Sequence, residues 1–164
     1  MSQIKFNKEE LLNRVIQQLE VDLQGLIVAA QANLDAATNE ESKPENEYDT
    51  RALEAGYIAG AQSQRAREIE ESLLVLKKLK VRDFKSTDKI DVTALVSLQS
   101  EKEKSWVFLL PRGAGQTLVQ QGIKIKVITG QSPLGEALLK QEVGEFISVI
   151  TAKTSMDYEI LEIY

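Results

Sequence analysis

The chain has 164 residues, of which 43% are hydrophobic and 27% charged, and its formal net charge is −5. This length allows one small globular domain together with an extended element. The chain contains no cysteine and no histidine, which excludes disulfides, zinc–thiolate sites and imidazole bases. No apolar run approaches the roughly 18 residues of a membrane-spanning helix, and the N-terminus lacks the apolar core of a secretory signal. We therefore expect a cytoplasmic protein with no membrane partner.

The first half of the sequence carries two long segments with a helical repeat. The first helix should begin after Asn7, with Glu10 three residues on as in a capping box. Its apolar seam comprises Leu12, Ile16, Leu19, Leu23, Leu26, Ala30, Asn33 and Ala37. The second seam, read backwards, comprises Leu76, Leu73, Ile69, Ala66, Gln62, Ala59, Ala55 and Ala52. The two seams match in length and predict an antiparallel coiled-coil hairpin over residues 1–82, with an arm of roughly 45 Å.

Acidic side chains gather in the segment between the two seams. The window 40–49 contributes −4 of the net charge, and Pro44 within it would stop a helix. Such a charge run is commonly a solvated loop. However, repulsion among clustered carboxylates is relieved by a cation, and oxygen ligands suit a hard ion such as Mg²⁺. We interpret the window as the acidic tip of the hairpin.

Beyond a polar connector at 83–91 the hydrophobic period changes to alternation, which predicts strands. We expect strands at 90–98, 106–110, 123–128, 146–150 and 158–164, and a short helix that begins after Ser132 and Pro133. The predicted fold is α+β: the hairpin, followed over residues 83–164 by a small antiparallel sheet with one short helix. The segment 112–115 lacks the ending of a phosphate-binding loop, and Trp106 and Phe108 alternate as core residues do.

Several segments together resemble the bacterial Gre transcript-cleavage factors. The most specific are Ile128-Thr129, Ser132-Pro133-Leu134-Gly135, Ala137-Leu138-Leu139, Val143-Gly144-Glu145 and the ending Tyr158-Glu159-Ile160-Leu161-Glu162-Ile163-Tyr164, with Glu45-Asn46-Glu47-Tyr48 near the tip. The resemblance implies a coiled-coil hairpin followed by a sheet domain of the FK506-binding-protein type.

The resemblance also implies a function. In this family the sheet domain docks at the rim of the RNA polymerase secondary channel, and tip carboxylates reach the active centre near the RNA 3′ end. They hold a second Mg²⁺, so that the polymerase cleaves a backtracked transcript; the factor is not itself an enzyme. The matching acid pair here is Glu41 and Glu45, with Glu47 as a further metal ligand. The family pair is an aspartate and a glutamate three apart, whereas these two glutamates are four apart.

Partner contacts carried over by the resemblance fall on the strand-to-helix corner: Gln131, Ser132, Pro133, Leu134 and Gly135. Gln131 stands where some members have an acidic residue. Two other functions remain open. One is a regulator that occupies the secondary channel without stimulating cleavage and competes with other channel factors. The other is a peptidyl-prolyl isomerase, suggested only by the type of sheet domain.

Overall fold

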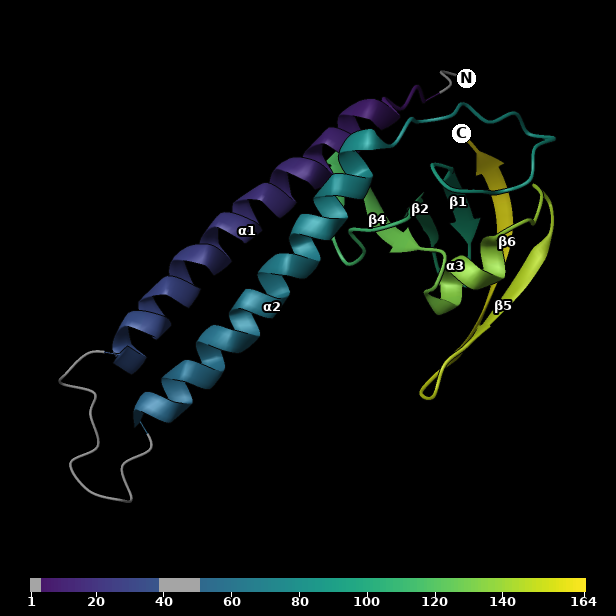
Figure 1. Ribbon diagram of the computed structural model, residues 1–164. Coiled ribbons are helices and arrows are strands. Elements are labelled where there is room, and N and C mark those ends of the chain that lie inside the picture. Colours follow the sequence, from purple (N-terminus) through teal and green to yellow (C-terminus); the bar gives the residue numbers. More distant parts are fainter. Residues whose placement is uncertain (1–3, 39–50) are drawn as a thin grey trace. The chain divides into compact units, whose positions relative to one another are not determined.

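The computed structural model describes residues 4–38 and 51–164, except for the side chains of residues 34, 37–38 and 51–59. Its elements, in chain order, are α1 (Lys8–Thr38), α2 (Arg51–Lys78), β1 (Leu95–Gln99), β2 (Lys104–Leu110), β3 (Thr117–Gln120), β4 (Ile123–Thr129), α3 (Pro133–Leu138), β5 (Phe146–Ile150) and β6 (Ser155–Ile163) (Figure 1). The chain divides into two compact units: a helical unit, Ile16–Leu74, and a sheet unit formed by Met1–Val15 with Val75–Tyr164. The fold class is as predicted. The predicted domain limits, 1–82 and 83–164, stay a prediction.

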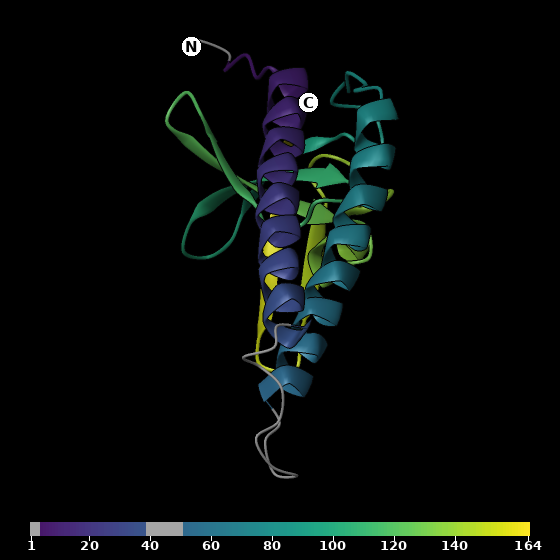
Figure 2. The same ribbon diagram turned by 60° about the vertical axis from the view of Figure 1, so that its left-hand side comes forward.

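In the helical unit, α1 and α2 run antiparallel along the predicted seams (Figure 2). Leu19, Ala66, Ile69 and Leu73 are buried. Farther along, the Asn33 side-chain amide donates to the Gln62 side-chain carbonyl at 2.7 Å, so two seam positions meet as a polar rung between the helices. Both residues were on the predicted seams, so the two seams face each other at this point. Among the described residues, no helix is long and apolar enough to cross a membrane.

Glycine at position 25 is unfavourable for α1, because glycine in a helix interior costs about 0.5–1 kcal/mol relative to alanine. No atom lies within 4 Å of the place where a β-carbon at Gly25 would stand. We therefore expect Gly25→Ala to raise the free energy of unfolding by about 0.5–1 kcal/mol. Urea denaturation followed by circular dichroism measures this change. A lower free energy of unfolding in the variant would contradict this prediction and would mean that position 25 requires glycine for a reason other than local packing.

The start of α1 belongs to the sheet unit and is capped as predicted. The Asn7 side-chain oxygen accepts from the Glu10 backbone N–H at 3.0 Å. The reciprocal half of the capping box is absent, because the Asn7 backbone N–H donates instead to the Gln120 side chain at 2.9 Å. The Glu10 carboxylate pairs with Arg14 at 2.6 Å. Sequence reasoning placed the cap correctly but could not foresee that β3 would supply its partner.

The sheet has six strands in the order β3-β4-β2-β1-β6-β5. All neighbouring pairs are antiparallel except β2 and β4, which run parallel. The sheet is therefore mixed, not purely antiparallel as predicted. The parallel pair arises because the chain leaves β2 at Leu110, crosses in a loop, and makes β3 before returning as β4. We did not predict β3, since its four residues show only one buried hydrophobic side chain, Leu118.

The start of β1 also differs from the prediction, which began a strand at Ile90. Residues 91–94 instead form a turn, in which the Ala94 N–H donates to the Asp91 carbonyl at 3.0 Å. Thr93 there has φ 73°, outside the strand region. Ile90 and Ala94 are nevertheless fully buried, so the apolar pattern reported burial and not strand geometry.

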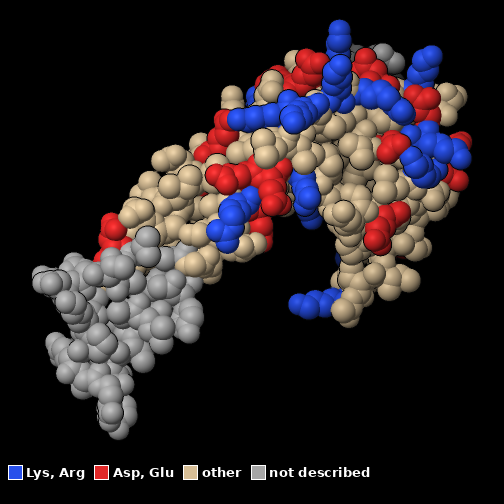
Figure 3. Space-filling model, viewed as in Figure 1, with Lys and Arg blue, Asp and Glu red and all other residues tan. Residues whose placement is uncertain are grey.

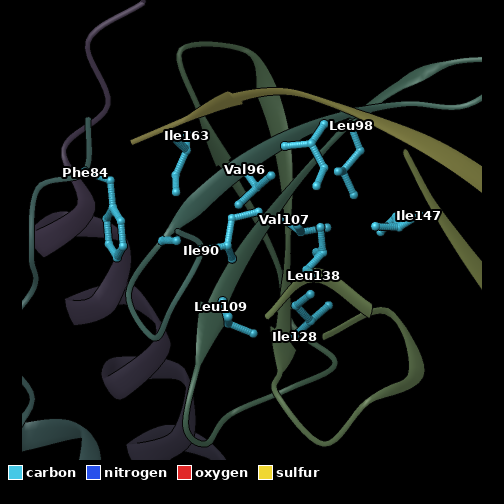
Figure 4. Close-up of a cluster of buried hydrophobic side chains, with 12 residues drawn as sticks. Phe84, Ile90, Val96, Leu98, Val107, Leu109, Ile128, Leu138, Ile147 and Ile163 are labelled. Atoms are coloured by element: carbon cyan, nitrogen blue, oxygen red, sulfur yellow. The ribbon is translucent and has the colours of Figure 1, made fainter. Parts of the chain in front are cut away.

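One hydrophobic core lies between the sheet and α3 (Figure 4). Strand residues that face it include Val96, Leu98, Val107 and Leu109, and α3 contributes the fully buried Leu138. The rest of the buried cluster is Phe84, Ile90, Ala94, Ile128, Ile147, Ile160 and Ile163. The predicted core aromatics are both buried, Phe108 completely and Trp106 to 7% exposed. The Trp106 ring contacts Phe6, with ring centroids 4.7 Å apart.

Lys8 ties the start of α1 to the segment between α2 and β1. Its Nζ donates to the backbone carbonyls of Arg82 and Thr93, the latter at 3.0 Å, and lies 4.9 Å from the centre of the Phe84 ring. The residue is only 6% exposed. Burial lowers the pKa of the Lys8 ammonium from 10.5 to about 8, against the opposing attraction of Asp83. Two backbone carbonyls therefore stabilise the partly desolvated ammonium group of Lys8.

The lowered pKa predicts a pH dependence of stability. Between pH 8 and 10.5 the unfolded chain binds a proton at Lys8 that the folded chain releases, so folding becomes more favourable as the pH rises. We expect the stability advantage of the wild type over Lys8→Met to grow between pH 7.5 and pH 10, by on the order of 1–3 kcal/mol. Parallel denaturation of both proteins at each pH cancels the titration of the other lysines. An advantage that stays constant or shrinks would contradict this prediction.

Candidate functional site

The predicted acidic tip lies outside the described residues. Glu41, Glu45 and Glu47 therefore keep their roles as predictions, and so does the Mg²⁺ that they would hold. Within residues 4–38 and 51–164, no three acidic side chains come together in a way that could hold a metal ion. The site that the structure does describe is the corner between β4 and α3, where the sequence predicted partner contacts.

Ser132 organises this corner through three hydrogen bonds. Its Oγ donates to the Thr129 carbonyl at 2.7 Å and accepts from the Gly135 N–H at 3.1 Å. Its own N–H donates to the Thr129 carbonyl at 3.1 Å. Ser132 is thus the N-cap of α3, with Pro133 at the first helical position, as predicted. One hydroxyl joins the end of the strand to the start of the helix.

Gly135 is required by close packing at the same corner. A β-carbon there would stand 1.9 Å from the Thr129 carbonyl oxygen and 3.0 Å from the Gly130 Cα. Both obstacles are backbone atoms, so no side-chain rotation relieves the overlap. Of the five predicted contact residues, Gln131 and Pro133 are exposed, Ser132 and Leu134 are half-buried and Gly135 is buried. The corner therefore presents Gln131 and Pro133 outward on a rigid backbone.

A mostly apolar hollow of about 310 Å³ lies beside the corner. Ser132, Pro133 and Leu134 form one wall. The other residues around it come from the loop before β3, from β4 and from the β5–β6 hairpin: Ala114, Gly115, Lys126, Val127, Ile128, Val149, Thr151, Thr154, Met156 and Tyr158. Sequence reasoning found the corner but not the hairpin side, because residues 20 positions away gave no motif.

Two carboxylates in the sheet unit are paired with lysines. The Lys140 ammonium lies 2.5 Å from the Asp91 carboxylate and lowers the pKa of Asp91. Similarly, a hydrogen bond from Lys104 at 3.0 Å lowers the pKa of Glu162. On the face shown in Figure 3, basic and acidic side chains of the described residues alternate and do not separate by sign. The corner itself therefore offers shape, apolar surface and neutral polar groups more than charge.

Comparison with known proteins gives a family match for the C-terminal half of the chain. Residues 85–164 match the family model "Transcription elongation factor, GreA/GreB, C-term". Among solved structures, the chain is similar to GreA factor homolog 1 (Gfh1) of Thermus thermophilus, at 23% identity and a TM-score of 0.38, covering 93% of this chain and 94% of that one. Thermus aquaticus Gfh1 gives 23% identity, a TM-score of 0.39 and coverages of 93% and 92%. For GreA/GreB from Nitrosomonas europaea the identity is 20% and the TM-score is 0.35, and the match covers 71% of this chain and 94% of that one. No curated protein sequence matches significantly.

The match over residues 85–164 contains the whole sheet, α3 and the corner at Ser132. This region defines a sheet domain of the kind found in transcription elongation factors. Residues 85–164 therefore belong to the GreA/GreB C-terminal family, as the resemblance of the C-terminal motifs predicted.

The two roles of the Ser132 hydroxyl can be separated by mutation. Ser132→Ala removes both Oγ hydrogen bonds, and loss of an N-cap typically costs about 1 kcal/mol. Ser132→Asp keeps an acceptor for the Gly135 N–H but cannot donate to Thr129, so its carboxylate would face a carbonyl oxygen. We expect the free energy of unfolding to fall by about 1 kcal/mol or more in both variants, while Ser132→Thr stays close to the wild type.

Chemical denaturation of the four proteins measures this order. If Ser132→Asp were as stable as the wild type, capping alone would account for the stabilisation by the Ser132 hydroxyl, and the bond to Thr129 would contribute little.

Proposed function

We propose that this protein binds RNA polymerase at its secondary channel in the cytoplasm and stimulates cleavage of backtracked transcripts through Glu41 and Glu45. The observation that carries the proposal is the family match of residues 85–164, which includes the corner and the adjoining hollow. The paired helices before it supply an arm, and the sequence between them supplies carboxylates.

The mechanism divides between docking and chemistry. Gln131 and Pro133, exposed on the corner, would contact the polymerase, and Leu134 with the apolar hollow would receive a nonpolar side chain of the partner. Glu41, Glu45 and Glu47 would accept a Mg²⁺ that the polymerase active centre shares. A second metal ion stabilises charge on the phosphate and lowers the pKa of the attacking water. The cleaving enzyme would be the polymerase.

The arm suits this role because small residues follow the seams toward the window 40–49. Ala66 is buried on α2, and the rung of Asn33 and Gln62 replaces a pair of large apolar side chains. Small residues let two helices approach closely, which keeps an arm narrow. A globular core would favour larger side chains at these positions.

A second candidate function rests on the spacing of the acid pair. Glu41 and Glu45 are four positions apart with Pro44 between them, whereas the two acids of the family pattern are three positions apart. Because catalysis depends steeply on the placement of reacting groups, this change favours a regulator that occupies the channel without stimulating cleavage. Such a protein would inhibit or compete with cleavage factors.

The decisive experiment uses backtracked elongation complexes of RNA polymerase from the same organism, with Mg²⁺, and follows the RNA 3′ end on a gel. We expect the wild type to shorten the transcript to a product that can be re-extended. Glu41→Ala with Glu45→Ala should lower the cleavage rate at least about 100-fold while binding is retained, since only the metal ligands are lost. Glu101→Ala with Glu103→Ala removes the same charge from an exposed turn of the sheet unit and should cleave normally.

Two further arms separate the alternatives. Gln131→Ala with Pro133→Ala should weaken polymerase binding and cleavage together, because both residues are exposed at the corner. A wild-type protein that binds and competes with a known cleavage factor, but never shortens the RNA, would establish the non-cleaving regulator. Cleavage that survives in the double glutamate variant would overturn the assignment of Glu41 and Glu45.

A further inference from the structure

The two edges of the sheet are finished differently. At the β3 edge, the Arg14 guanidinium donates to the Val119 backbone carbonyl at 2.7 Å, and Gln120 is bonded to Asn7. At the other edge stands β5, and its outward side chains Phe146 and Ile150 are 75% and 76% exposed. These are the most exposed large hydrophobic side chains that the structure describes. An uncovered apolar edge strand is a template for pairing with another strand.

The hydrogen-bond parity of β5 shows which backbone groups are unpaired. The Thr151 N–H donates to the Thr154 carbonyl at 2.8 Å, and the Ile160 N–H donates to the Glu145 carbonyl at 2.9 Å. In an antiparallel ladder hydrogen-bonded positions alternate, so residues 145, 147, 149 and 151 point their backbone groups at β6. Residues 146, 148 and 150 point theirs at the free edge. The N–H and C=O groups and the exposed apolar side chains thus belong to the same three residues.

We propose that β5 pairs with β5 of a second copy of this chain, antiparallel about a two-fold axis at Ser148. This register places Ser148 opposite Ser148 of the second copy. It also places Phe146 of each copy opposite Ile150 of the other copy. It is the register that uses all three outward-facing residues of both copies, and it forms six backbone hydrogen bonds. Each Phe146 ring then covers an Ile150 side chain on the same face of the joined sheet.

Charge favours the same arrangement. β5 has no charged residue, so no like charges oppose each other along the pair. In the proposed register Lys153, in the turn after β5, comes beside the exposed turn of Glu142 and Glu145 on the second copy, and the symmetry repeats this contact. Parallel pairing of the two β5 strands would instead bring the two acidic turns together. The acidic turn before β5 and the basic turn after it therefore favour the antiparallel pair.

The dimer should be weak and concentration-dependent. One five-residue strand edge with two large side chains per copy buries less than the roughly 1,200 Å² of a standard stable interface. Association should therefore appear only at high protein concentration. The dimer is argued from the edge of β5 and not from polymerase binding, so its failure would leave the proposed function untouched.

Cysteine trapping tests the register directly, because the native chain has no cysteine. In Ser148→Cys the two thiols would face each other across the axis, with Cα atoms about 5.5 Å apart, within the range for a disulfide. The matched control is Lys153→Cys on the same hairpin, where the two thiols would be about 33 Å apart. Under mild oxidation we expect at least about 10-fold more covalent dimer from Ser148→Cys. Equal trapping of both variants, or none at position 148, overturns the proposal.

A charge exchange provides a second measurement without cysteine. Sedimentation equilibrium should show wild-type dimer growing with concentration, and Ser148→Lys or Ser148→Glu alone should be monomeric, because like charges would meet on the axis. An equimolar mixture of the two variants should associate at least as well as the wild type. Thermal unfolding checks that each variant is folded, since Ser148 Oγ donates to Asp157 at 2.6 Å. A wild type that remains monomeric at every concentration, or a mixture that does not associate, refutes symmetric pairing.

Discussion

The sheet unit depends on a close approach of two backbone segments, the end of β4 and the first turn of α3. A β-carbon at residue 135 would overlap the Thr129 carbonyl oxygen, so only glycine permits this approach. The approach lets the Ser132 hydroxyl bond both segments, and it places Leu138 in the core between α3 and the sheet. The same geometry turns Gln131 and Pro133 outward and makes one wall of the hollow. The cap of α3, the position of Leu138 in the core and the candidate docking surface therefore all depend on glycine at position 135.

Local sequence chemistry predicted those parts of the fold that local interactions decide. Asn7 and Ser132 were identifiable as N-caps, because a capping side chain acts on the N–H group three residues ahead. The seam positions Asn33 and Gln62 were identifiable because a helical repeat marks one face over many turns. The start of α3 after Ser132 and Pro133 could be found because its motif is continuous in sequence.

The parts that sequence reasoning missed are decided by distant partners. β3 is a strand because Leu118 and its neighbours pair with β4, and four residues contain too little alternation to show this. The parallel alignment of β2 and β4 is a property of the connection, which residue patterns do not encode. Burial of Ile90 and Ala94, which lie before β1 and outside any strand, gave the same alternation as a strand would. The hollow joins the corner to Met156 and Tyr158, whose proximity follows only from the complete sheet.

Charge separates the two proposed tasks of the molecule. The window 40–49 carries −4 of a total of −5, so the rest of the chain is nearly neutral. In the sheet unit the carboxylates of Asp91 and Glu162 are neutralised by lysines, and the corner is formed by uncharged residues. A docking surface built in this way gains affinity from shape and apolar contact, which salt screens little. In the proposed function, in contrast, a divalent cation is attracted by the carboxylates of the window. In this proposal the two tasks use separate parts of the chain, so the protein would bind its partner through the corner without holding the metal.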